Sequence, residues 1–106
     1  MTNYFWVYTT LSKKPEAIEI SRSLVKEKLI ACSNILENMT SVYEWEGKVC
    51  EENEVSLIMK TTKEKIKSLK KKIIELHPYE CPAILCIPIE DGDENFLNWI
   101  KKQVSH

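Results

Sequence analysis

His77 is the side chain in this sequence best suited to binding a transition metal, because neutral imidazole is a common ligand of copper, zinc and nickel. Glu80 and Cys81 follow closely enough to add an oxygen and a sulfur ligand. The position also suits a structural histidine at a helix C-terminus, bonded to backbone carbonyls and favoured by the helix dipole. No second ligand stands at a recognisable spacing, so both interpretations of His77 stay open.

Lysines form the densest group of charges, between residues 60 and 72. Such a group can attract an anion or a nucleic-acid backbone. The lysines are spread around a predicted helix instead of lining one stripe, the chain has no aromatic RNA-binding motif, and its formal net charge is -1. We therefore expect a solvated helix face and no nucleic-acid partner.

The remaining chemical groups exclude several classes of site. Two groups of acidic residues could offer oxygen ligands to a cation: Glu51, Glu52 and Glu54, and Glu90, Asp91, Asp93 and Glu94. Neither group has the spacing of a calcium-binding loop. The four cysteines have no C-x-x-C spacing, so neither a zinc knuckle nor a thioredoxin-type redox pair is expected. In a reducing compartment they should be free thiols. With only two glycines and no Ser-His-Asp pattern, we predict no phosphate loop and no enzyme. The first residues resemble neither a signal peptide nor a membrane span, so a cytoplasmic location without membrane contact is expected.

The elements that would position these groups can be predicted from apolar spacing. With 106 residues and no linker, we expect one domain, 1–106. Tyr4–Tyr8 has no polar alternation, which predicts a central strand buried on both faces. The first helix should begin near Pro15, with Ala17, Ile18, Ser21, Leu24, Val25 and Leu29 recurring at helical spacing.

A second helix is predicted from Lys63 to about Leu76, ended by Pro78. Ala83–Ile89 should form a last strand at a sheet edge, because Pro88 cannot donate to a ladder. Asp93 is a suitable N-cap for a short final helix. The inward residues of this helix are expected to be Phe96, Leu97, Trp99, Ile100 and Val104.

Between the two long helices, a hairpin is predicted that is longer than so small a chain needs. Glu46 and Gly47 supply the tight turn, and Ala31–Glu46 and Lys48–Thr61 supply the arms. The register should pair Trp45 with Lys48, Tyr43 with Cys50 and Leu36 with Leu57. Arms of about 12 residues would be roughly 40 Å long, against a radius of gyration of about 13 Å for such a domain. The tip must therefore overhang the core or pack on a neighbour.

The predicted order, βαββαβ with a C-terminal helix, is that of an α+β, ferredoxin-like fold. Right-handed crossovers place the first and third strands in the middle of the sheet. The other two strands become exposed edges that a neighbour could cover.

Several blocks of this sequence resemble the CutA family. They are Leu29–Asn34, Ser41–Lys48, Glu54–Val55, Lys60–Thr61, His77–Glu80 and Asn98–Trp99, in order over nearly the whole chain. The resemblance implies a ferredoxin-like homotrimer in which the long hairpins pack on adjacent subunits. It also implies tolerance to divalent cations such as copper, and no established catalytic reaction.

The same resemblance singles out a set of positions that could line a cleft between subunits: Tyr43, Trp45, Lys60, Tyr79 and Glu80. A carboxylate beside a lysine and tyrosine hydroxyls could bind a polar ligand. The set could equally be an interface network in which Glu and Lys satisfy each other and aromatic rings supply contact area.

Two functions follow from these interpretations. The first is a trimeric divalent-cation tolerance protein that binds Cu or Zn, with His77 as a candidate ligand and no required cofactor. The alternative is a small-ligand sensor, or a scaffold for protein partners, similar in architecture to PII signalling proteins.

Overall fold

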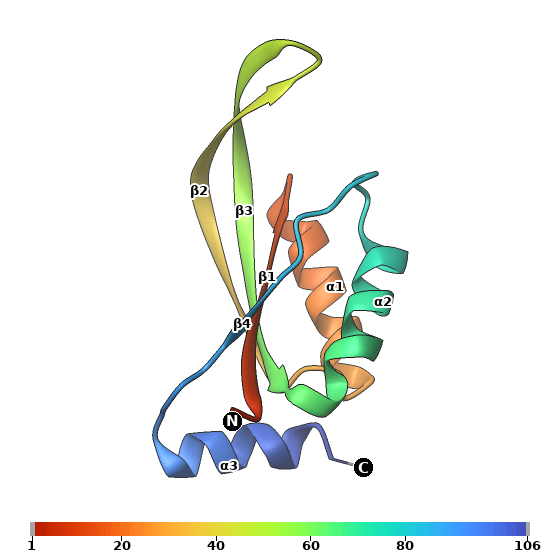
Figure 1. The fold of residues 1–106 in the computed structure, drawn as a ribbon. Coiled ribbons are helices and arrows are strands. Elements are labelled where there is room, and N and C mark those ends of the chain that lie inside the picture. The colour runs from red at the N-terminus through yellow and green to blue at the C-terminus, as the bar shows by residue number, and fades with distance from the viewer. Residues whose placement is uncertain (1, 106) are drawn as a thin grey trace.

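The computed structural model describes residues 2–105 and contains a four-stranded sheet in the order β2-β3-β1-β4 (Figure 1). Every pairing is antiparallel, and β1 and β3 are the central strands. This confirms the predicted α+β ferredoxin-like fold. The strands are β1 (Tyr4–Leu11), β2 (Cys32–Trp45), β3 (Lys48–Thr62) and β4 (Leu85–Pro88).

Three α-helices complete the fold of residues 2–105. They are α1 (Lys14–Lys26), α2 (Ile66–Leu76) and α3 (Glu94–Gln103), and a 3-10 turn, η1 (Lys63–Lys65), precedes α2. Lys63–Lys65 was predicted as part of the second helix, but it forms this tighter turn instead. The last strand is also shorter than the predicted Ala83–Ile89.

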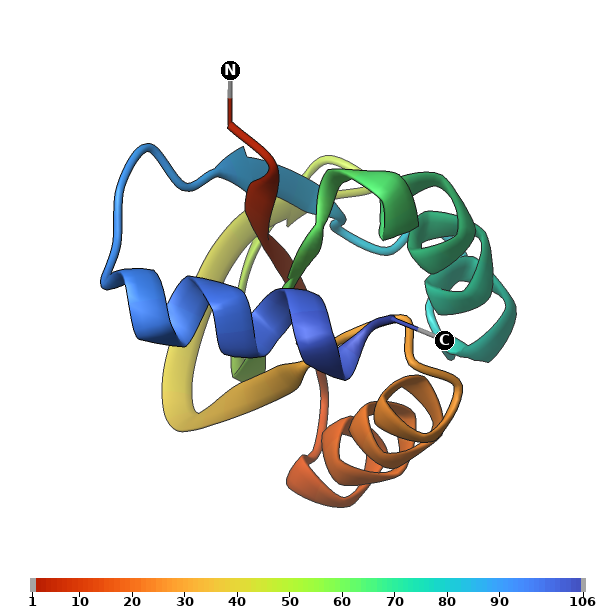
Figure 2. The same ribbon diagram turned by 90° about the horizontal axis from the view of Figure 1, so that it is seen from below.

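The core lies between the sheet and the helices α1 and α2, which cover one of its faces (Figures 1 and 2). Alternate residues of β1 and β3 point into this core, since successive side chains of a strand lie on opposite faces. Val7, Leu57 and Met59 are fully buried there. They pack with helix residues at the predicted spacing, including Leu24, Leu69 and Ile73.

The opposite side of the sheet, which we call the open face, carries large apolar side chains. Trp6 lies between Lys60 of β3 and Ile87 of β4, and Tyr8 lies between Ile58 and Leu85. Trp6, Leu85 and Ile87 are 43%, 57% and 45% exposed. The prediction that the first strand is buried on both faces is therefore wrong at Trp6 in the single chain.

The hairpin of β2 and β3 extends past the body of the molecule (Figure 1), whose dimensions are 45 × 25 × 23 Å. Glu46 and Gly47 both have positive φ values, 50° and 80°, as the tight hairpin turn of type I′ requires. The predicted pairs Trp45–Lys48 and Tyr43–Cys50 are confirmed.

A β-bulge separates the tip of this hairpin from its base. Between the pairs Leu36–Ser56 and Met39–Glu54, β2 has two residues where β3 has one. One of the two is Asn38, with φ 61°, a conformation that asparagine tolerates better than most residues. The predicted pair Leu36–Leu57 is therefore wrong. Ile35 pairs with Leu57 instead, and Leu36 is 54% exposed.

Helix α3 crosses the end of the sheet below β1 (Figures 1 and 2). Its Ile100 and the following Val104 pack against Ala31, as expected of inward residues. Phe96 and Trp99, also predicted to face inward, are instead 46% and 40% exposed and stack on each other at 5.6 Å. The outward side of α3 therefore carries two large aromatic rings.

Asp93 caps α3 as predicted, because its carboxylate accepts a hydrogen bond of 3.0 Å from the Phe96 N–H. Replacing Asp93 with alanine should lower the free energy of unfolding by about 1 kcal/mol, the usual contribution of an N-cap. Urea unfolding measures this change. Glu90→Ala, at an exposed position before the helix, is the control; an equal loss in both variants would contradict the capping role.

Candidate functional site

His77 joins the C-terminus of α2 to the end of β1. Its side chain is only 7% exposed, and its Nε2 lies 2.7 Å from the Thr10 carbonyl oxygen. Its Nδ1 accepts a hydrogen bond of 3.1 Å from the Tyr79 N–H, so the ring proton must be on Nε2 and must donate to Thr10. The ring also meets that of Tyr79 edge-on, with centroids 4.7 Å apart.

Both nitrogens of His77 are thus used by backbone groups. A metal ion could bind this imidazole only after one of the two hydrogen bonds is broken. Within residues 2–105, no group of three or more His, Cys, Asp or Glu side chains is arranged to hold a metal ion. The hydrogen bonds of His77 to the backbone of Thr10 and Tyr79 are those expected of a structural histidine at a helix C-terminus.

Four of the five residues predicted to line a cleft between subunits lie together, within one chain, around a cleft of about 490 Å³. Tyr43 and Trp45 line it from the distal hairpin, and Tyr79 and Glu80 line it from the loop between α2 and β4. Cys81 of the same loop lies beside them. We call this space the hairpin cleft.

Tyrosine hydroxyls hold two carboxylates in the hairpin cleft. Tyr79 donates a hydrogen bond of 2.7 Å to Glu54 and lies 3.0 Å from the Ser12 hydroxyl, and Tyr43 donates one of 2.6 Å to Glu52. Burial, followed by the bond to Glu54, raises the pKa of Tyr79 to about 12, although Ser12 opposes the shift. The bond to Glu52 is the main cause that raises the pKa of Tyr43 to about 12. Both hydroxyls therefore stay protonated donors at neutral pH.

The raised pKa of Tyr79 predicts a stability change in alkaline solution. The unfolded phenol ionises near 10.0 and the folded one near 12, so the stabilisation by this hydroxyl is complete below pH 10 and is lost as the pH rises to 12. The stability difference between wild type and Tyr79→Phe should shrink over that interval in urea unfolding. A difference that stays constant across it would contradict the assignment. Glu54→Gln should lower the Tyr79 pKa only in part, because burial, its largest cause, remains.

Lys60, the fifth predicted cleft residue, lies elsewhere. It is 9% exposed on the open face, donates to the Asn34 side chain, and its ammonium lies 6.0 Å from the centre of the Trp6 ring. It lines a separate space of about 380 Å³ together with Ile87 and Phe96. In the described chain, therefore, Lys60 does not meet Glu80.

Sequence reasoning missed the importance of Ser12, Glu52 and Glu54 for this cleft. The hairpin register contained a signal for Glu52, because it is a diagonal neighbour of Tyr43 once Tyr43 pairs with Cys50. Ser12 gave no such signal, since it approaches Tyr79 only through tertiary structure.

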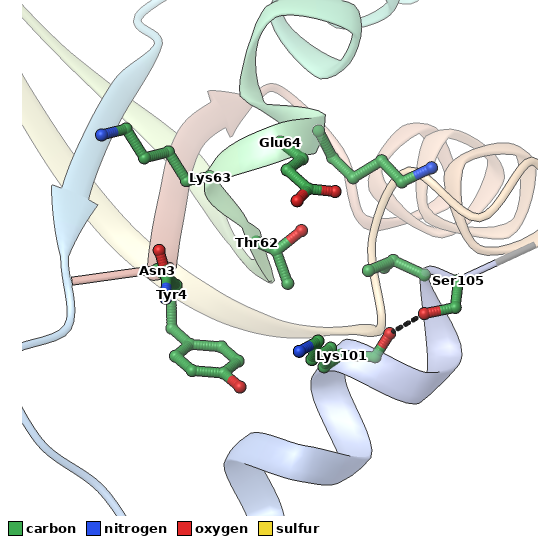
Figure 3. A pocket seen from close by; sticks show the side chains of 9 residues that line it. Asn3, Tyr4, Thr62, Lys63, Glu64, Lys101 and Ser105 are labelled. Atoms are coloured by element: carbon green, nitrogen blue, oxygen red, sulfur yellow. Dashed lines mark hydrogen bonds between the residues drawn. The ribbon is translucent and has the colours of Figure 1, made fainter.

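A further cavity, of about 390 Å³, lies among the start of β1, η1 and α3 (Figure 3). Lys63 and Lys101 line it, but their ammonium groups lie apart in Figure 3, and Ser105 donates to the Lys101 carbonyl. This cavity does not direct the lysine-rich region toward one anion.

None of the helices in residues 2–105 is long and apolar enough to cross a membrane.

Comparison with known proteins identifies similar sequences over almost the full chain. The profile of a family described as CutA1 divalent ion tolerance protein matches residues 5–103. A divalent-cation tolerance protein CutA from Pyrococcus horikoshii is 44% identical over 89% of this chain and 91% of its own length. One from Thermus thermophilus is 38% identical over 91% of this chain and 93% of its own.

A solved structure of a CutA1 protein is also similar to this chain. The crystal structure of the divalent ion tolerance protein CutA1 from Ehrlichia chaffeensis superimposes with a TM-score of 0.95 at 37% identity. The match covers 100% of this chain and 99% of that one.

Proposed function

Because the chain belongs to the CutA1 divalent ion tolerance family, we propose that it acts in the response to divalent cations, as a homotrimer that binds metal ions such as copper. The observation that carries this proposal is the open face. Trp6, Leu85 and Ile87 are large apolar side chains that one subunit leaves about half exposed. Exposed apolar patches of this kind are typical of protein interfaces.

Two further features support assembly. The strands β2 and β4 are both sheet edges, with backbone groups available for a neighbour to cover. The distal hairpin extends beyond its own core, as expected of an arm that packs on another subunit. In a trimer, a neighbouring subunit would cover the edges and contact the hairpin.

Metal binding is supported by the donor atoms of the hairpin cleft, which include the carboxylates of Glu52, Glu54 and Glu80 and the thiol of Cys81. Oxygen and sulfur ligands of these types bind zinc and copper. Since one described chain arranges no group of three such side chains around a point, a stable site would need donors from a second subunit. In this proposal, metal binding depends on assembly.

Native mass spectrometry followed by calorimetric titration with Cu(II) and Zn(II) tests the proposal. We expect a trimer mass and a saturable metal isotherm for wild type. If metal binding is lost in Glu54→Gln, the metal site lies in the hairpin cleft. If metal binding is lost in His77→Ala, the metal binds the imidazole. A monomer mass contradicts the assembly, and titrations without heat contradict metal binding.

The volume of the hairpin cleft favours a second candidate, a PII-like small-ligand sensor or scaffold. A thermal-shift screen of metabolites tests it, because a ligand at 100 times its Kd adds about 2.7 kcal/mol to stability. A screen without any stabilising compound would count against this candidate.

Both candidates describe a binding protein instead of an enzyme. The predicted cytoplasmic location belongs to the same proposal.

A further inference from the structure

We propose that the hairpin cleft binds a small organic cation, an ammonium or guanidinium compound, between its aromatic walls and its carboxylates. The inference rests on the small-ligand candidate above and does not require a bound metal.

The walls of the cleft are aromatic. Tyr43, Trp45 and Tyr79 all line a space of about 490 Å³, which is large enough for a compound of several non-hydrogen atoms. Trp45 is 59% exposed and Tyr43 39%, so one chain leaves much of their surface uncovered. An organic cation placed over such rings is attracted to the negative charge of the ring faces.

The charged side chains that line the cleft in the described residues are all acidic. Glu52, Glu54 and Glu80 contribute carboxylates, and none of the described residues that line the cleft is a lysine, arginine or histidine. An anionic ligand would therefore be repelled. The acids and the aromatic rings both favour a cation.

Two of the carboxylates are already held in place. Glu54 accepts from Tyr79 through one oxygen, and Glu52 accepts from Tyr43 through one oxygen. The other oxygen of each has lone pairs for an N–H of a ligand, and an ammonium or guanidinium group supplies such donors. Since these carboxylates are fixed by their tyrosines, less conformational entropy is lost on binding.

The same arrangement suits an organic cation better than a bare metal ion. A metal needs several ligands around one point, and the described chain provides no group of three such side chains. An organic cation spreads its charge over a larger volume, and it gains from ring faces as well as from separated carboxylates.

NMR titration of the isotopically labelled protein with ethylammonium chloride and with ethylguanidinium chloride tests the inference. Sodium chloride at equal ionic strength and zinc chloride are the comparison salts. We expect saturable shifts at Trp45 and Tyr79 with an organic cation and not with sodium. Glu54→Gln keeps the shape of the side chain and should weaken binding roughly fivefold.

Matched controls exist on the same elements. Glu51 pairs with Val42 on the other side of the hairpin, so Glu51→Gln removes the same charge outside the cleft and should leave the affinity unchanged. Trp45→Leu should weaken binding, whereas Trp99→Leu on α3 should not. Native mass spectrometry of each variant shows whether its assembly has changed.

Equal affinities in Glu54→Gln and Glu51→Gln would overturn the inference, as would shifts reproduced by sodium chloride. Shifts with zinc alone would reject the organic cation and leave the proposed metal function standing. A wild type that binds both organic cations but gives no metal isotherm would support the inference while rejecting metal binding.

Discussion

Replacing Ile87 with glutamate is expected to convert the proposed trimer into monomers at micromolar concentration. Ile87 is 45% exposed on the open face, next to Trp6, and the isolated subunit can hydrate a carboxylate there. In an assembly that buries this face, the same carboxylate would lose its hydration. The one cation that the described residues place in the same space, Lys60, already donates to the Asn34 side chain. Burying a charge that is not well paired costs roughly 3 kcal/mol or more, which weakens association more than a hundredfold. Analytical ultracentrifugation measures the result.

Ile74→Glu is the matched control for this experiment. Ile74 is 60% exposed on α2, on the helical side of the molecule and away from the open face. The same change of residue type should therefore leave the trimer intact. If Ile87→Glu also remains a trimer with unchanged stability, the open face is not the assembly surface.

Replacing His77 with alanine should lower the free energy of unfolding by about 2–4 kcal/mol. The change leaves the Thr10 carbonyl and the Tyr79 N–H without their side-chain partner, and each such group costs about 1–3 kcal/mol when it stays buried. It also releases the loop that positions Tyr79 in the hairpin cleft. Denaturant unfolding of the wild type and the variant at one fixed pH measures the loss.

Two conservative variants separate the bonds of His77. Glutamine can place an amide N–H where Nε2 donates to Thr10, and asparagine can place a carbonyl oxygen where Nδ1 accepts from Tyr79. Each should recover part of the lost stability. A loss of metal affinity in His77→Ala without a loss of stability would contradict the structural role.

Local signals in the sequence were sufficient to predict much of the fold. The turn at Glu46 and Gly47 and the cap at Asp93 depend on single residues with strong conformational preferences, and both are present. The central positions of β1 and β3 follow from the order of elements and the handedness of crossovers.

The β-bulge could not be predicted from apolar pattern. Ile35 and Leu36 are adjacent and both apolar, so either could have faced Leu57 in the core. The register counted back from the turn favoured Leu36. At the tip of the hairpin the pairs follow the register counted from the turn. The bulge at Asn38 shifts the pairing by one residue at the base, so Ile35 pairs with Leu57 and enters the core.

The errors at Trp6, Phe96 and Trp99 have a common cause. Their apolar character predicted burial, but all three are at least 40% exposed in one chain. In the proposed assembly a neighbouring subunit would bury these rings, and the buried centre of such an interface is apolar in the same way as a core. Sequence alone therefore cannot separate the two.

The candidate site was predicted in part. The resemblance to a known family named Tyr43, Trp45, Tyr79 and Glu80, which do share a cleft. It also named Lys60, which does not line this cleft in one chain. Lys60 lies near the C-terminal end of β3 and lines a different space. The carboxylate partners of the tyrosines became evident only from the paired strands and the folded loop.

Because of the β-bulge at Asn38, the direction in which the distal hairpin points can change while its cross-strand pairs stay the same. Deleting Asn38 would leave Glu37 opposite Val55 and would preserve both flanking pairs, Leu36–Ser56 and Met39–Glu54. The bend and added twist that a bulge gives a strand would be lost. A one-residue deletion would thus re-aim the distal hairpin while it keeps both flanking pairs. In the proposed trimer, the direction of the hairpin could therefore evolve independently of the pairing that stabilises each subunit.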